Sequence, residues 1–166
     1  MGMTFKDQSA SGKSKDAARQ LIHGESTLTL ATAGEKGIWS APVYYVYLNG
    51  SFFFFSSPHS RHIRQALASG QAAASLFSRA DAWETIRGIQ MQGTVRPIRN
   101  PALSLEVIAA YLKRFPFTRD FFPKNSRPDP KAFLDRFRAK LYAFSPTEAF
   151  YMDNRCGFGS RLKIQL

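Results

Sequence analysis

The sequence has few of the features that mark secreted, membrane-spanning or metal-binding proteins. Its single cysteine, Cys156, cannot form an internal disulfide, as is typical of proteins from a reducing compartment. No apolar run approaches the roughly 18 residues that a membrane span requires. The charged first 20 residues lack the apolar stretch of a secretion signal. We therefore expect a soluble cytoplasmic protein with no membrane contact.

Motifs for metal binding and for hydrolysis are also missing. The sequence has three histidines, and His59 and His62 lie three residues apart without an accompanying cysteine or carboxylate motif. There is no Gly-x-Ser-x-Gly elbow and no phosphate-binding Gly-rich loop. We predict no metal site, and no residue stands out as catalytic.

Acidic residues are scarce relative to basic ones. The chain has 23 Lys and Arg against 12 Asp and Glu, a net charge of +11. Residues 96–140 hold eleven basic and four acidic residues, so 11 − 4 = +7 of that excess lies there. Such a stretch can bind nucleic acid, serve an anionic cofactor or simply face solvent, and composition favours the solvated face.

The 166 residues fit one domain, and aromatic residues are abundant at 14%. We expect a flexible arm over residues 1–13 and one domain over 14–166. The aromatic excess suggests an apolar interface or a pocket for a ring-shaped ligand. The Phe52–Phe55 run is apolar on both faces of its strand, which favours a homodimer unless another element covers it.

Hydrophobic periodicity predicts an antiparallel barrel with peripheral helices. Asn49-Gly50 is a strong hairpin signal, and Asn100-Pro101 is a typical helix start. The expected strands are 27–33, 38–48, 51–56, 72–77, 85–98 and 140–150, the last bent at Pro146. The expected helices are 13–23, 60–69, 101–115 and a short one from 129 to about 137, before a tail over 151–166.

An anion site is predicted where the third strand ends and a helix begins. Ser60, Arg61 and His62 lie in the first helical turn, where backbone N–H groups and the helix dipole favour an anion. The alternative is that Ser57 or Ser60 caps the helix while the basic residues face water. These residues alone support both interpretations equally.

Three segments carry a resemblance to a known family. Residues 39–45, 53–67 and 72–77 resemble the pyridoxamine 5′-phosphate oxidase-like superfamily of FMN-binding split barrels. Residues 87–93, 114–116 and 153–159 are similar to an uncharacterised bacterial subgroup of it. The resemblance implies a mainly β fold, an antiparallel split barrel, with FMN bound at the two-fold interface of a homodimer.

The resemblance also implies a set of cofactor-binding residues. They would follow the flavin ring along the second strand, hold the phosphate at the helix start, and approach from the tail of the second chain. In this sequence they are Ser40, Ala41, Pro42, Val43, Tyr44, Tyr45, Phe55, Ser56, Ser57, Ser60, Arg61, His62, Gln90, Asn154, Phe158 and Arg161.

The sequence departs from the oxidases at several positions. His62 replaces the lysine of the phosphate-binding Arg-Lys pair, and Gly88 stands where a flavin-contacting glutamine is expected, with Gln90 as its substitute. No histidine follows His62 and no tryptophan follows Trp83, so the Arg-x-His segment that binds pyridoxamine phosphate is missing. Oxidation of pyridoxamine phosphate is therefore disfavoured.

Three function classes remain open. The leading one is an FMN-dependent oxidoreductase that transfers hydride through flavin N5 to or from a small molecule. The second is a binding module without turnover that holds a flavin, a deazaflavin or haem. The third, a nucleic-acid-binding protein that uses residues 96–140, is disfavoured because the aromatic groups at 115–117 and 121–123 resemble packing or dimer contacts.

Overall fold

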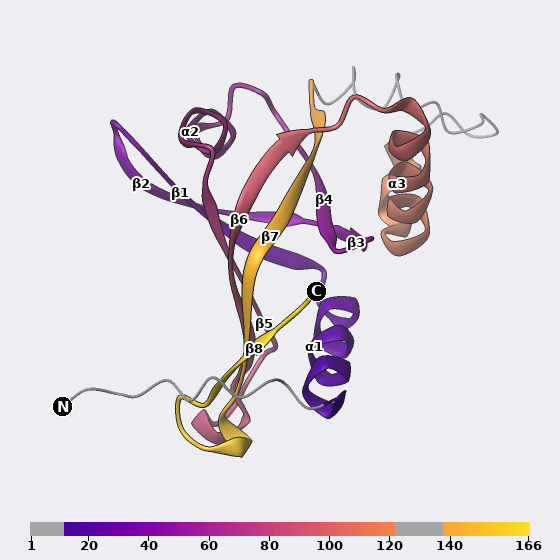
Figure 1. Cartoon of the computed structure of the whole chain (residues 1–166). Helices are drawn as coiled ribbons and strands as arrows, with labels where there is room; N and C mark the ends of the chain where they lie inside the picture. The colour runs from indigo at the N-terminus through magenta and orange to yellow at the C-terminus, as the bar shows by residue number, and fades with distance from the viewer. Residues whose placement is uncertain (1–11, 122–137) are drawn as a thin grey trace.

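A computed structural model describes residues 12–121 and 138–166 of the chain. Its strands form one curled antiparallel sheet with the order β2-β1-β5-β6-β7-β4-β3, and β8 pairs with β7 (Figure 1). The strands are β1 Thr27–Gly34, β2 Gly37–Tyr44, β3 Val46–Leu48, β4 Ser51–Ser56, β5 Ala72–Phe77, β6 Arg87–Pro97, β7 Lys140–Asp153 and β8 Arg161–Ile164. This arrangement confirms the predicted antiparallel split barrel.

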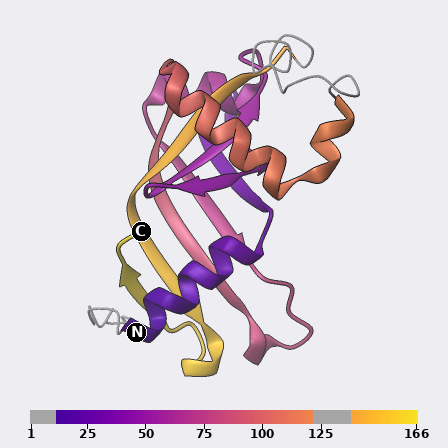
Figure 2. The ribbon, with the colours of Figure 1, turned by 90° about the vertical axis from the view of Figure 1, so that its right-hand side faces the viewer.

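Three α-helices of the described residues lie against this sheet. They are α1 Gly12–Gly24, α2 Arg61–Ser69 and α3 Pro101–Arg114, with short 3-10 turns η1 Trp83–Thr85, η2 Pro116–Phe121 and η3 Asn154–Cys156. Asn100 caps α3 as predicted, since its side chain accepts the backbone N–H groups of Ala102 and Leu103. Figure 2 shows α1 and α3 on the same side of the molecule, whereas α2 lies on the other side in Figure 1.

The main core lies inside the curl of the sheet. Its largest buried side chains include Tyr45, Phe52, Phe54, Tyr142 and Phe144. A second cluster fills the space between β4, β7 and α3, and it consists of Val46, Phe53, Val107, Tyr111, Phe115, Leu141 and Ala143.

The second cluster changes the interpretation of the Phe52–Phe55 run. Phe52 and Phe54 face the main core, whereas Phe53 packs in the cluster with α3, and Phe55 packs against it. The ring of Phe55 meets that of Tyr111 edge-on at 4.7 Å. Because α3 covers this face within one chain, the run is no argument for a homodimer.

Several predicted boundaries are wrong. The strand expected over 38–48 breaks at Tyr45, whose buried hydroxyl donates to Ile22 O at 2.6 Å, so two strands form. The strand expected to end at 150 continues to Asp153, and the expected tail contains β8. In the strand expected over 85–98, residue 85 ends η1 and β6 begins at 87.

Two other expectations fall partly or wholly outside the described residues. The first helix begins at Gly12, so residues 12 and 13 of the predicted arm are helical, and the rest of the arm is outside. The short helix predicted from 129 to 137 is outside as well. Among the described helices, none has the length and apolar character to cross a membrane.

Candidate functional site

A cavity of about 390 Å³ lies where β2 and β4 end beside α3. Its lining combines an apolar wall with the polar side chains of Ser56 and His62 at one side. Six predicted site residues line it: Pro42, Val43, Tyr44, Phe55, Ser56 and His62. The remaining lining residues are Tyr111, Phe117, Thr118 and Ala139. The structure thus brings together residues from both halves of the predicted site.

Ser56, Ser60 and His62 form a hydrogen-bonded cluster at the polar side of this cavity. His62 Nε2 lies 2.9 Å from Ser56 Oγ and 3.4 Å from Ser60 Oγ, and the two hydroxyl oxygens are 3.1 Å apart. Ser60 also donates to Ser57 O at 2.8 Å. No side chain caps α2, and Ser57 Oγ instead accepts the N–H of His59. The structure therefore does not support the alternative in which a serine caps this helix.

The cluster carries no charge at neutral pH. Partial burial lowers the pKa of His62 below its usual value of 6.5, because removal from water disfavours the imidazolium. The two hydroxyls and the neutral imidazole can exchange donor and acceptor roles. An anion would meet hydrogen-bond donors here, and its negative charge would favour protonation of His62.

Arg61 points away from the cluster. Its Nη2 donates to Lys36 O and to Gly37 O in the β1–β2 turn, the latter at 3.3 Å. Its guanidinium stacks 4.8 Å above the Trp39 ring, and its buried Nε has no hydrogen-bond partner. Arg61, the residue predicted to bind the phosphate, therefore holds the β1–β2 hairpin in this structure and does not line the cavity.

Gln65, one helical turn further along α2, explains why the hairpin lies so close. It accepts a hydrogen bond from Thr32 at 2.8 Å and donates to Gly37 O at 2.8 Å. A Cβ on Gly34 would lie 2.9 Å from Gln65 Cγ, so only glycine permits this approach. The close approach brings the carbonyls of the turn within reach of Arg61.

Strand β2 presents alternate residues to opposite faces. Ser40, Pro42 and Tyr44 are exposed, whereas Ala41 and Val43 are buried. Tyr45, immediately after the strand, is fully buried and tied to Ile22, so its side chain is not available to a ligand. Tyr45 is thus excluded from side-chain contact with a ligand, whereas contact with the rest of the 40–45 segment stays a prediction.

The wall of the cavity includes residues that the sequence analysis did not identify. The Tyr111 hydroxyl donates to Tyr44 O, and burial raises the pKa of Tyr111, so this donor stays protonated. The Tyr44 ring also meets Phe115 and Phe117 edge-on, at 5.3 and 5.8 Å between centroids. The i, i+4 spacing of Tyr111 and Phe115 predicts a packed helix face but not the strand end that it meets.

Gln90 lies in a different cavity of about 860 Å³ on the outer face of the sheet. It pairs across the sheet with Ser75 of β5 and Phe150 of β7. Of the predicted site residues, Pro42 borders this outer cavity as well as the first one. The structure therefore does not bring Gln90 together with His62.

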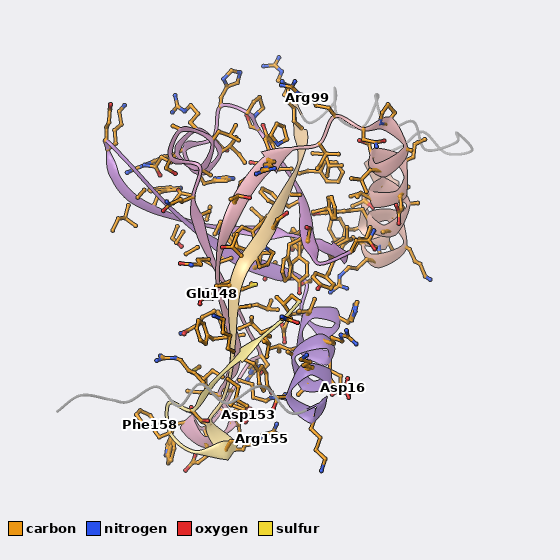
Figure 3. The ribbon with its side chains drawn as sticks, viewed as in Figure 1. Asp16, Arg99, Glu148, Asp153, Arg155 and Phe158 are labelled. Carbon is orange, nitrogen blue, oxygen red and sulfur yellow. The ribbon has the colours of Figure 1, made fainter. Side chains whose placement is uncertain are left out.

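The predicted tail residues lie at the opposite end of the molecule from α2 (Figures 1 and 3). Asn154 is buried, donates to Trp83 O at 2.7 Å and accepts the N–H of Gly159 at 3.3 Å. Phe158 is 83% exposed and meets the Trp83 ring edge-on at 5.8 Å. Arg161 is partly buried in β8, and its Nε has no partner. Within one chain these residues do not reach the cavity.

An ion pair holds the loop that carries this tail. Asp153 accepts hydrogen bonds from Arg155 Nε and Nη2 at 2.9 and 2.6 Å, and from the Tyr151 hydroxyl at 3.0 Å. The Arg155 guanidinium lowers the pKa of Asp153 to about 2, so the carboxylate is ionised at neutral pH. Neighbouring Cys156 is exposed. In the part of the chain that the structure describes, no group of three His, Cys, Asp or Glu side chains could hold a metal ion.

Comparisons with known proteins agree with the fold. A family model described as pyridoxamine 5′-phosphate oxidase matches residues 14–140. The chain is 21% identical over 140 residues to UPF0306 protein YhbP of Escherichia coli O157:H7, covering 83% of this chain and 84% of that protein.

Solved structures of low sequence identity share the architecture. HutZ, a haem storage protein from Vibrio cholerae, superposes with a TM-score of 0.65 at 16% identity over 82% of this chain and 92% of its own. A FAD-binding protein from Mesorhizobium loti gives a TM-score of 0.61 at 11% identity over 86% and 94% of the two chains. At these identities the likeness concerns the fold alone.

Proposed function

Because the chain belongs to the pyridoxamine 5′-phosphate oxidase family, we propose that it binds FMN in the cavity between β2, β4 and α3. The observation that carries this proposal is the pairing of an apolar wall with the Ser56–Ser60–His62 cluster. A cavity of about 390 Å³ falls within the usual range for small-molecule sites, and ligand sites typically combine apolar walls with a few polar groups.

The residues present suit the two parts of FMN. Ser56, Ser60 and His62 would donate hydrogen bonds to the phosphate, and Arg61 would join them on leaving the turn carbonyls. Pro42, Val43, Tyr44, Phe55 and Phe117 would bound the flavin ring. Tyr111 would hold the end of β2 in place through its hydrogen bond to Tyr44 O.

The proposed reaction is hydride transfer involving a small-molecule substrate other than pyridoxamine phosphate. When bound, FMN would supply a hydride acceptor and donor at N5. The residues of the chain would bind the phosphate, orient the ring and exclude water from one side of it. None of the described cavity side chains is a carboxylate, and His62 is committed to the phosphate in this arrangement, so we assign no general base.

We also propose a homodimer in which a second copy covers the exposed face of β2. Strand β2 is an edge strand, and Ile38 is 80% and Trp39 44% exposed there. An uncovered apolar edge strand is an association surface. Phe158, Asn154 and Arg161 lie at the opposite end of the molecule from α2. They could reach the cavity only from a second copy of the chain.

A binding module for haem is the second candidate. HutZ, which shares the fold, is a haem storage protein. His62 supports this candidate because partial burial keeps its imidazole neutral at the edge of the cavity, and neutral imidazole is a common ligand of haem iron. This role would require His62 to give up its hydrogen bond to Ser56.

The proposal is tested by titrating the ligand-free protein with FMN and with riboflavin, which lacks the phosphate. We expect saturation at one FMN per chain and tighter binding of FMN than of riboflavin. Consumption of NAD(P)H by the FMN complex with candidate acceptors then separates an enzyme from a binding module. Absence of saturable flavin binding by a folded protein would overturn the proposal.

A further inference from the structure

We propose that Lys140 supplies a cation to the phosphate of the bound ligand, an inference that rests on the proposed FMN site. The phosphate would then lie between the Ser56–Ser60–His62 cluster and the first residue of β7. Lys140 is not among the residues identified from the sequence, and strand register is what brings it to the site.

Lys140 lies next to Ser56 because β4 pairs with β7. Ser56 and Lys140 are direct antiparallel partners at the ends of these strands. Side chains of directly opposed residues lie on the same face of a sheet, with Cβ atoms about 5 Å apart. Ser56 uses that face to contact His62, so Lys140 emerges beside the polar side of the cavity. Its neighbour Ala139 lines the cavity itself.

A phosphate dianion gains most from charged donors, and the three cluster residues are neutral in the ligand-free protein. Arg61 engages two carbonyls and the Trp39 ring. Lys140, by contrast, is the strand partner of Ser56, and its use by a phosphate there would need no change in the β1–β2 turn.

The Lys140 side chain is exposed, and none of the ion pairs among the described residues involves it; these are Arg79–Asp81, Arg155–Asp153 and Lys163–Glu148. The four-carbon stem of lysine is flexible and carries a compact charge with three donors. Lys140 can therefore turn its ammonium toward a phosphate at Ser56 without breaking an ion pair described in the structure.

The test compares Lys140→Gln with wild-type protein in equilibrium titrations with FMN and riboflavin. The matched control is Lys13→Gln, which removes one exposed positive charge from the first turn of α1, away from α2 in Figure 1. We expect Lys140→Gln to weaken FMN binding about tenfold, since a charge-assisted contact is lost, and to leave riboflavin binding unchanged. The FMN affinity of the variant should also depend less on salt.

The outcomes separate this inference from the function on which it rests. Wild-type protein that binds FMN no better than riboflavin overturns the phosphate site, and Lys140 with it. A wild-type preference for FMN that Lys140→Gln retains in full overturns the role of Lys140 alone. An equal loss in Lys13→Gln would mean that net charge, and not the position of Lys140, produces the effect, and this result also overturns the inference.

Discussion

His62 is the residue whose protonation links the cavity to pH. Burial lowers its pKa in the ligand-free protein, and a bound phosphate would raise it again. Binding would therefore take up a proton over the interval between the two pKa values. Affinity should increase as pH falls through the pKa of the complex and level off below that of the free protein.

We predict that FMN binds about five- to tenfold more tightly near pH 6.5 than near pH 8.5, as one charged contact is gained. Titrations of the protein with FMN at several pH values in this range measure the effect. The range lies above the second pKa of the phosphate, about 6, so the phosphate itself stays largely dianionic. His62→Gln keeps a donor but cannot titrate, so its affinity should be flat over the same range. A variant with the same slope as wild type would show that another group titrates.

Arg61 has a structural contact that the sequence does not reveal, and its phosphate role stays a prediction. Arg61→Ala should weaken FMN binding about tenfold or more if the guanidinium reaches the phosphate. It should also lower the melting temperature, because the clamp on Lys36, Gly37 and Trp39 is lost. The riboflavin affinity of the folded variant separates the two effects. Equal losses for FMN and riboflavin would assign Arg61 to the hairpin alone.

At the scale of elements, local signals predicted well where one short segment decides the structure. Asn49 and Gly50 both have positive φ, at 49° and 79°, as the predicted hairpin turn requires. The register shift between β6 and β7 falls at Gly93 opposite Pro146, where a bend was expected. The start of α3 and the alternation of β1 and β5 also match the periodicity.

Long-range packing decided the elements that were not predicted correctly. The break at Tyr45 depends on the end of α1, more than 20 positions earlier, where Ile22 O accepts its hydroxyl. Phe53 is buried because α3 packs against it. Strand β8 has only four residues and forms by pairing with β7, so its own sequence carries little signal.

A substitution at Gly93 tests the register shift between β6 and β7. A Cβ at this position would lie 2.2 Å from Ser145 O and 2.9 Å from Pro146 Cα, both of them backbone atoms. We expect Gly93→Ala to lower the free energy of unfolding by about 2 kcal/mol or more, because the two strands must separate locally. Urea denaturation measures it.

Gly24→Ala is the matched control for this substitution. It places a methyl group at the end of α1, where no atom lies within 4 Å apart from the chain neighbours and the backbone of the helix itself, so its effect should stay within about 0.5 kcal/mol. Equal stabilities of the two variants would contradict the described register between β6 and β7.

In the whole molecule, the predicted site residues at the start of α2 and at the end of β4 lie together, as the sequence analysis expected. The sequence analysis did not predict that the other site residues lie elsewhere. Pro42, Val43, Tyr44, Phe55, Ser56 and His62 share one cavity. Gln90 lies on another face, and Asn154, Phe158 and Arg161 lie at the far end. Which cavity a strand face borders and which end of the molecule a residue occupies depend on the curl of the sheet, which no local pattern encodes.

The proposed dimer gives a prediction about exposed β2. Light scattering over a dilution series should show a dimer that FMN strengthens, because binding at the interface favours the assembled state. Ile38→Lys should raise the dimer dissociation constant about tenfold or more, since it places a positive charge on the apolar edge strand β2. Leu105→Lys, at a 55% exposed position on α3, is the control and should leave the dimer intact. Dissociation caused by the control alone would place the interface elsewhere.

Competition between the two candidate cofactors decides whether the cavity is a flavin site. Ligand-free protein is mixed with one equivalent each of FMN and haemin, passed through a desalting column and examined by absorbance. We predict a flavin spectrum with one FMN per chain and no Soret band. Retention of haemin with loss of all flavin would mean that the cavity is not a flavin site and would favour a haem-binding module.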